Sequence, residues 1–153
     1  MILEKELLMN YYRIRNLILF CAIICLVIGM NLLEINVLVL AYLGDTIYEN
    51  YVRKFLINKG IPNVDQLQKE AISYVSAKRQ AYYLQEMMNH NFLKEDELDV
   101  VKRARNYKTT SHPKNTDIIT YKYATGLEAL IGYLDLSKNK ERIDEIMNFI
   151  FIQ

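Results

Sequence analysis

Apolar residues recur at intervals of three and four positions along most of the chain, which is the spacing of one face of an α-helix. Five helices are predicted from this pattern, at about residues 36–59, 63–89, 94–106, 118–136 and 139–151. No segment shows the strict alternation of apolar and polar residues that is typical of a β-strand. The pattern therefore predicts an all-α fold.

The expected helix ends follow from local chemistry. Gly60 and Pro62 interrupt the first helix, and a polar run separates the third helix from the fourth. Asn63 is expected to cap the second helix, and Thr116 or Asp117 the fourth, because short polar side chains accept hydrogen bonds from free N–H groups. The fourth helix carries an apolar stripe expected to enter the core, formed by Tyr123, Leu127, Leu130, Ile131 and Leu134.

The N-terminal region carries an uncharged apolar run from Leu17 to Met30, preceded by Arg13 and Arg15. A bilayer span needs about 18–20 such residues, so the run is short unless it extends to Leu33. Three interpretations stay open. Translation starts at Met30, or the run is a membrane or interfacial anchor, or it is an additional packed helix.

The composition allows one domain with a hydrophobic core, since 52% of 153 residues are hydrophobic. The net charge of +1 excludes a global basic field, but charge is unevenly distributed. From Lys102 to Lys122 there are six basic residues and one acid, a local charge of +5. Such a segment suits contacts with phosphates, and an ordinary solvated loop is the alternative.

Several common chemistries find no support in the sequence. Cys21 and Cys25 lie one helical turn apart in the apolar run, where two small apolar fillers are expected. His90 and His112 lack the spacing of metal ligands, and the chain contains no phosphate-binding glycine loop and no nucleophile elbow.

Two carboxylates occupy unusual places. On a helical wheel, Asp45 lies on a mostly apolar face with Leu38, Ala41, Glu49, Val52 and Leu56. Buried carboxylates are costly unless they are paired or bind a metal, and an ion pair of Glu49 with Arg53 is the simpler explanation.

The second unusual carboxylate is Glu128, which is aligned with Tyr121, Ala124, Thr125 and Gly132. The small residues in this set allow another helix to approach closely. Two carboxylates from two packed helices would form a plausible oxygen-rich site for Mg²⁺.

Two sequence blocks around these acids resemble the ribonuclease III superfamily. Residues 40–49, LAYLGDTIYE, resemble its signature LEFLGDAVL, and residues 125–134, TGLEALIGYL, resemble its second block, D-x-x-EALIGAxYL. Leu38, Ala41 and Thr125 stand where the general family has further acids. Together with the expected absence of a double-stranded-RNA-binding domain after the last helix, this pattern resembles the small Mini-III form. The segments 76–81, 102–106 and 113–117 also resemble that form.

The resemblance implies a helical, dimeric endonuclease domain at residues 30–153, with residues 1–29 as an apolar extension. Asp45 and Glu128 would be the catalytic, metal-binding carboxylates for Mg²⁺, and Tyr42 would lie at the dimer interface. Mg²⁺ would activate a water molecule for attack on a phosphodiester, leaving 5′-phosphate and 3′-hydroxyl ends. The residues expected to contact RNA are Lys78, Arg103, Arg105, Lys108 and Lys114.

The expected substrate is double-stranded RNA, namely the ends of the 23S ribosomal RNA precursor, which implies a cytoplasmic enzyme. A large-subunit ribosomal protein that presents the RNA is an expected partner, and membrane association through residues 17–33 is the less favoured location. Two alternatives stay open. One is a non-catalytic RNA-binding or ribosome-assembly module that retains the fold, and the other is a membrane-tethered helical protein.

Overall fold

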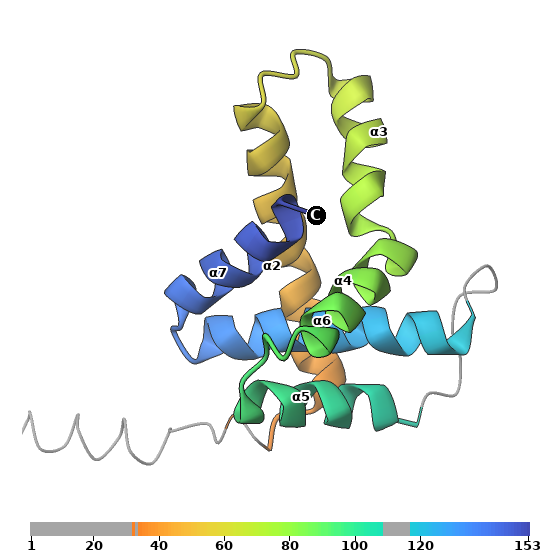
Figure 1. Ribbon diagram of the computed structural model, residues 1–153, viewed down its shortest axis with the longest axis vertical. Helices are drawn as coiled ribbons and strands as arrows, with labels where there is room; N and C mark the ends of the chain where they lie inside the picture. The colour runs from red at the N-terminus through yellow and green to blue at the C-terminus, as the bar shows by residue number, and fades with distance from the viewer. Residues whose placement is uncertain (1–31, 33, 109–116) are drawn as a thin grey trace, which may run out of the picture. The chain divides into compact units, whose positions relative to one another are not determined.

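The computed structural model describes residues 32, 34–108 and 117–153, in which helices are joined by short turns and connections. No strand occurs in this part of the chain, which confirms the all-α prediction. In chain order the helices are α2 (Val37–Asn58), α3 (Val64–Val75), α4 (Ala77–Asn89), α5 (Glu95–Asn106), α6 (Ile118–Leu136) and α7 (Lys140–Phe151) (Figure 1). The apolar run at 17–30, with its two cysteines, and the residues Lys114, His112 and Thr116 lie outside the described residues.

Helices α2, α3, α6 and α7 begin at residues whose side chains accept hydrogen bonds from the first free amides. The carboxamide oxygen of Asn63 accepts a hydrogen bond from the Asp65 amide at 2.8 Å, and the Asp117 carboxylate accepts one from Thr120 at 2.9 Å. These bonds confirm Asn63 and Asp117 as predicted caps. The prediction for the first helix was correct to within one residue at each end, and α6 has the predicted bounds.

The segment predicted as one helix from 63 to 89 is two helices, α3 and α4, separated by Ser76 in an extended conformation. Backbone carbonyl groups at the end of α3 accept hydrogen bonds from side chains of the neighbouring helices α2 and α4. The Tyr48 hydroxyl donates to the Tyr74 carbonyl at 3.0 Å, and Arg79 Nε donates to the Ser73 carbonyl at 2.9 Å. The prediction of a single helix was wrong because tertiary contacts, not a Gly or Pro, stabilise this break.

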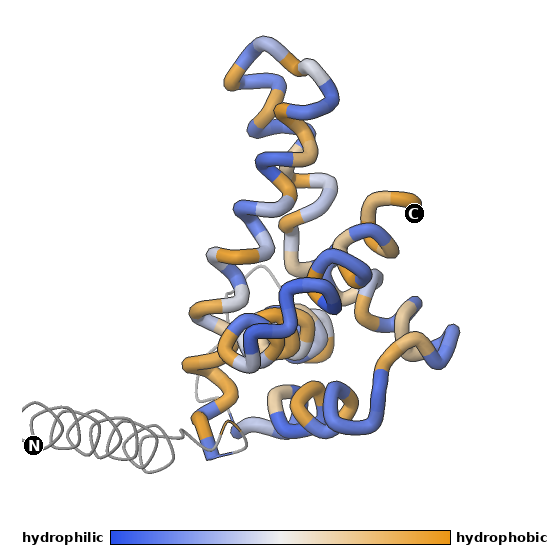
Figure 2. Tube along the Cα trace, turned by 90° about the vertical axis from the view of Figure 1, so that its left-hand side faces the viewer, coloured by the Kyte–Doolittle hydropathy of each residue, from blue (hydrophilic) through white to orange (hydrophobic). Residues whose placement is uncertain are grey.

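The core forms around α6, which crosses α2 and is covered by α4 and α5 (Figure 1). The predicted stripe is confirmed, since Leu127, Leu130, Ile131 and Leu134 are buried and Tyr123 is partly buried against them. By contrast, no residue of α3 is buried. Figure 2 shows hydrophobic and hydrophilic positions intermixed along α3 and the adjoining half of α2.

A buried ion pair joins α5 to α7. Arg142 Nε donates to the Glu97 carboxylate at 2.8 Å, and its Nη2 donates to the same carboxylate and to the Phe92 carbonyl. The Glu97 carboxylate also accepts from the Lys94 amide at the start of α5. Because both charges are paired and hydrogen-bonded, the cost of their burial is offset.

Within the described ranges, no helix has the length and hydropathy that crossing a bilayer requires.

Candidate active site

Two glycines bring α2 and α6 into backbone contact. A Cβ atom added to Gly44 would lie 1.8 Å from the carbonyl oxygen of Glu128, and one added to Gly132 would lie 2.1 Å from the carbonyl oxygen of Leu40. Any side chain at either position would clash with the opposite backbone, so glycine is required for this approach. The small residues near Glu128 therefore do permit the close helix contact expected from the sequence.

This contact places the two candidate carboxylates side by side. Asp45 follows Gly44 directly on α2, and Glu128 on α6 supplies the carbonyl that Gly44 touches. Asp45 remains exposed to solvent, whereas Glu128 is partly buried. The expectation that Asp45 lies on a buried apolar face needs correction, because Asp45 lies at the edge of that face while Val52 and Leu56 enter the core.

The environment of the pair disfavours ionisation of both carboxyl groups, first through burial and then through neighbouring negative charge. Burial, and then the neighbouring charge of Asp45, raise the pKa of Glu128 from 4.5 to about 8, although an interaction with Gln80 opposes this shift. Partial burial, and then the charge of Glu49, raise the pKa of Asp45. A positive ion between the carboxylates would relieve this repulsion, so the donor chemistry fits a divalent cation.

No group of three or more His, Cys, Asp or Glu side chains with metal-binding geometry occurs in the part of the chain that the structure describes. Glu49 forms an exposed ion pair with Arg53 at 2.5 Å. This is the ion pair that the sequence suggested as the reason for an acid at position 49 on a mostly apolar helix face. The protein oxygens available to a cation at this point are thus few, and water would complete its coordination, as is common for Mg²⁺.

Sequence reasoning missed one residue of this region, Gln80 on α4. Its side chain is buried, and its interaction with Glu128 favours the ionised carboxylate. The signal was present in the sequence, since Gln80 opens the inward stripe of α4 that continues with Leu84 and Met87. A polar residue at the first position of a buried stripe is a candidate for a role in a site.

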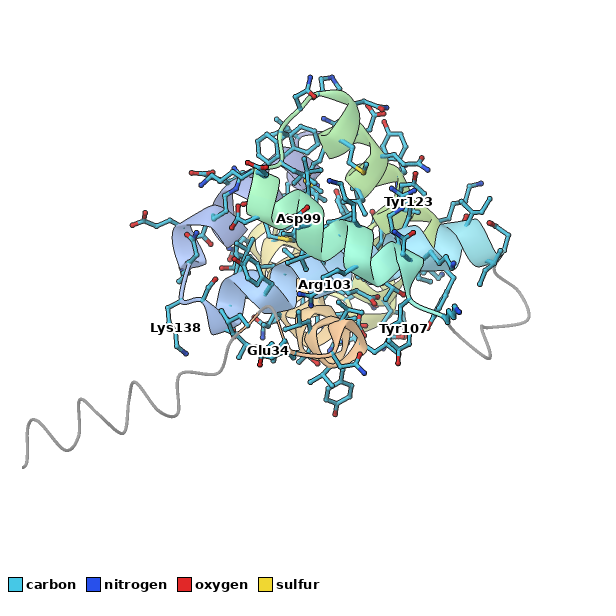
Figure 3. The ribbon with its side chains drawn as sticks, turned by 90° about the horizontal axis from the view of Figure 1, so that it is seen from below. Glu34, Asp99, Arg103, Tyr107, Tyr123 and Lys138 are labelled. Atoms are coloured by element: carbon cyan, nitrogen blue, oxygen red, sulfur yellow. The ribbon has the colours of Figure 1, made fainter. Side chains whose placement is uncertain are left out.

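The predicted RNA-binding residues do not all lie free at the surface. Arg103 donates to the Ile35 carbonyl at 3.0 Å, and the Arg105 guanidinium lies 3.8 Å from the centre of the Tyr123 ring. Figure 3 shows Arg103 on α5 near Glu34, ahead of the start of α2. Lys78 and Lys108 are exposed, and Lys114 lies outside the described residues.

Tyr42 lies on the outward side of α2, two residues after the first α2–α6 backbone contact. Its side chain is 82% exposed, and Val39, one turn earlier, is 56% exposed. Two large apolar side chains thus face solvent on one side of the helix that carries Asp45.

The sequence of the chain is similar to a known protein family and to individual members of it. Residues 38–139 match the family model described as the ribonuclease III domain. The Mini-ribonuclease 3 of Brevibacillus brevis is 54% identical over 116 residues, which are 76% of this chain and 85% of that protein. The Mini-ribonuclease 3 of Enterococcus faecalis is 45% identical over 116 residues, 76% of this chain and 88% of that protein.

A solved structure gives the same result at the level of the fold. The crystal structure of a protein from Fusobacterium nucleatum matches with a TM-score of 0.69 at 36% sequence identity. The match covers 77% of this chain and 93% of that one. The similarity therefore extends over nearly the whole of the solved protein.

Proposed function

Because the chain belongs to the ribonuclease III family, in its Mini-ribonuclease 3 group, we propose that Asp45 and Glu128 form its active site for cutting double-stranded RNA. Endoribonuclease activity follows from the family, and the assignment of these two residues follows from the site. The observation that carries the assignment is the Gly44–Glu128 backbone contact, which sets one carboxylate of each signature block beside the other.

Asp45 and Glu128 would hold a divalent cation, for which Mg²⁺ is the proposed identity. Held there, the cation would supply Lewis-acid chemistry, lowering the pKa of a bound water and stabilising charge on the leaving oxygen of a phosphodiester. Asp45 reaches solvent and is therefore accessible to a large substrate, whereas Glu128 is partly enclosed by the helices. The close α2–α6 contact sets the backbones that carry the two carboxylates next to each other before substrate arrives, which would lower the cost of organising the site.

The proposed substrate is the 23S ribosomal RNA precursor. Lys78 and Lys108 are exposed and available for phosphate contacts, and Lys114 belongs to the same proposal. Arg103 and Arg105 belong to the same proposal, although each already makes a contact within the protein, Arg103 with the Ile35 carbonyl and Arg105 with the Tyr123 ring. A large-subunit ribosomal protein that presents the RNA, and a cytoplasmic location, complete this proposal.

We further propose a homodimer of the domain at residues 30–153. The exposed side chains of Tyr42 and Val39 lie on one side of α2, where a second copy would bury them. Apolar surface of this kind favours association because burial removes it from water. Each subunit would then contribute one pair of carboxylates.

The test is the variant Asp45→Asn, which keeps the shape of the side chain and removes its charge. We expect the cleavage rate of duplex RNA in Mg²⁺ to fall by about 10²–10³-fold, the usual effect of losing one charge-stabilising group. RNA binding should stay near the wild-type value, and the metal-free melting temperature should not fall, because Asp45 is exposed and its charge opposes ionisation of Glu128. Asp65→Asn, at an exposed position in the first turn of α3, is the matched control and should cleave normally.

Cleavage by Asp45→Asn at the wild-type rate would show that Asp45 is not catalytic. Wild-type protein that binds duplex RNA but does not cut it in any divalent cation would support the non-catalytic module instead.

A further inference from the structure

Gln80 is a buried polar residue on the inward face of α4. The residue is 2% exposed, and the inward face of the helix continues with Tyr83, Leu84 and Met87. Its side-chain nitrogen Nε2 is buried and has no hydrogen-bond partner of good geometry among the described residues. Such groups are rare in native proteins, since a donor withdrawn from water without a partner destabilises the fold.

The position of this side chain connects it to the candidate active site. Leu84, one turn after Gln80 on α4, lies against α6 at Gly126, two residues before Glu128. Gln80 itself is close enough to Glu128 to oppose the rise in the pKa of that carboxylate. An amide is not needed for packing at this position, because methionine or leucine would fill similar space without an unpaired donor. The polar group is therefore explained by the site and not by the core.

We infer that Gln80 is a positioning residue, whose buried amide nitrogen is placed to donate to the carboxylate of Glu128 and to hold it for cation binding. Residues that hydrogen-bond to metal ligands orient those ligands and tune their affinity. With only two carboxylates proposed as ligands, the orientation of each has a large effect on cation binding. The inference rests on the proposed function, since it assumes that Glu128 binds the cation.

The experiment compares Gln80→Met with wild type in the full-length protein. Methionine keeps the length and the unbranched shape of glutamine but cannot donate to Glu128. Mn²⁺ affinity is measured by electron paramagnetic resonance, and melting temperature is measured without divalent cations. We expect Mn²⁺ binding to weaken about tenfold or more. The metal-free melting temperature should stay unchanged or rise, because an unpaired buried donor has been replaced by an apolar group.

Gln85→Met is the matched control, since Gln85 lies on the exposed side of the same helix. It should change neither Mn²⁺ affinity nor melting temperature. Gln80→Leu repeats the test with a different apolar shape. If both Gln80 variants melt lower while Mn²⁺ affinity stays at the wild-type value, or if neither folds, Gln80 is a packing residue and the inference is wrong.

Asp45→Asn separates this inference from the proposed function. If Asp45→Asn loses Mn²⁺ binding while Gln80→Met retains it, only the role of Gln80 is overturned. If Asp45→Asn also binds Mn²⁺ normally, the proposed metal site itself is wrong.

Discussion

Replacing Gly44 with alanine adds one methyl group at the point where α2 meets α6. The added Cβ would lie 1.8 Å from the Glu128 carbonyl oxygen and 2.7 Å from the Gly132 nitrogen. Folded proteins essentially never place a Cβ closer than 3.0 Å to such atoms, so the backbones must separate by at least 1.2 Å locally. The obstructing atoms belong to a helix backbone, which cannot rotate away as a side chain can.

Two consequences follow from this displacement. Overpacking of a well-packed core costs about 1–3 kcal/mol, and each kcal/mol lowers the melting temperature of a domain of this size by about 2–4 °C. A displacement of about 1 Å at catalytic groups can lower the rate by about 10²-fold. Gly44→Ala should therefore melt lower in calorimetry, and its folded fraction should cleave duplex RNA far more slowly.

Gly126→Ala is the matched control on α6. Its added Cβ would meet only side-chain atoms, the nearest being Leu84 Cδ2 at 3.0 Å. A small adjustment of that side chain accommodates the methyl group, so both stability and cleavage should change little. If Gly44→Ala keeps the melting temperature and cleavage rate of Gly126→Ala, backbone contact does not set the site geometry.

Three further predictions concern pH, RNA and assembly. Because the folded-state pKa of Glu128 is raised from 4.5 to about 8, the metal-free protein should lose stability as pH rises across that window. Glu128→Gln should remove this slope in thermal melts, and an equal slope in both proteins would contradict the assignment. Replacing Arg103, Arg105 and Lys108 with alanine should reduce the log–log salt dependence of duplex binding by about one unit for each lost phosphate contact. An unchanged slope in fluorescence anisotropy titrations would show that these three residues do not contact phosphates. Tyr42→Asp should yield monomers by light scattering, since an interface would have to bury the new charge, and a retained dimer would exclude Tyr42 from the contact.

The features of the fold that depend on local sequence were predictable. Asn63 and Asp117 are caps because their own side chains reach the following amides, and the core stripe of α6 follows from its spacing. The break at Ser76 was not predictable, because the groups that stabilise it include the Tyr48 hydroxyl from a different helix. Local patterns carry no information about such a partner.

Some residues of the candidate site could likewise be predicted from the sequence, and others could not. Asp45 and Glu128 were identified from two short blocks, and the structure brings them together. The engagement of Arg103 with the Ile35 carbonyl was not predictable, because it depends on how α5 meets the start of α2. Gln80 was also missed, although a polar residue at the start of the inward stripe of α4 was a signal; its nearness to Glu128 depends on how α4 packs against α6.

The backbone contact between Gly44 and Glu128 also has a consequence for how the chain folds. It joins residues 84 positions apart, so a long loop must close before the contact can form. Helical proteins with mostly local contacts fold fastest, and a central long-range contact slows folding relative to them. During synthesis, α2 emerges well before α6, and the carboxylate pair cannot exist until α6 has left the ribosome. Nuclease chemistry at this site would therefore be withheld from the nascent chain until most of the domain has been made.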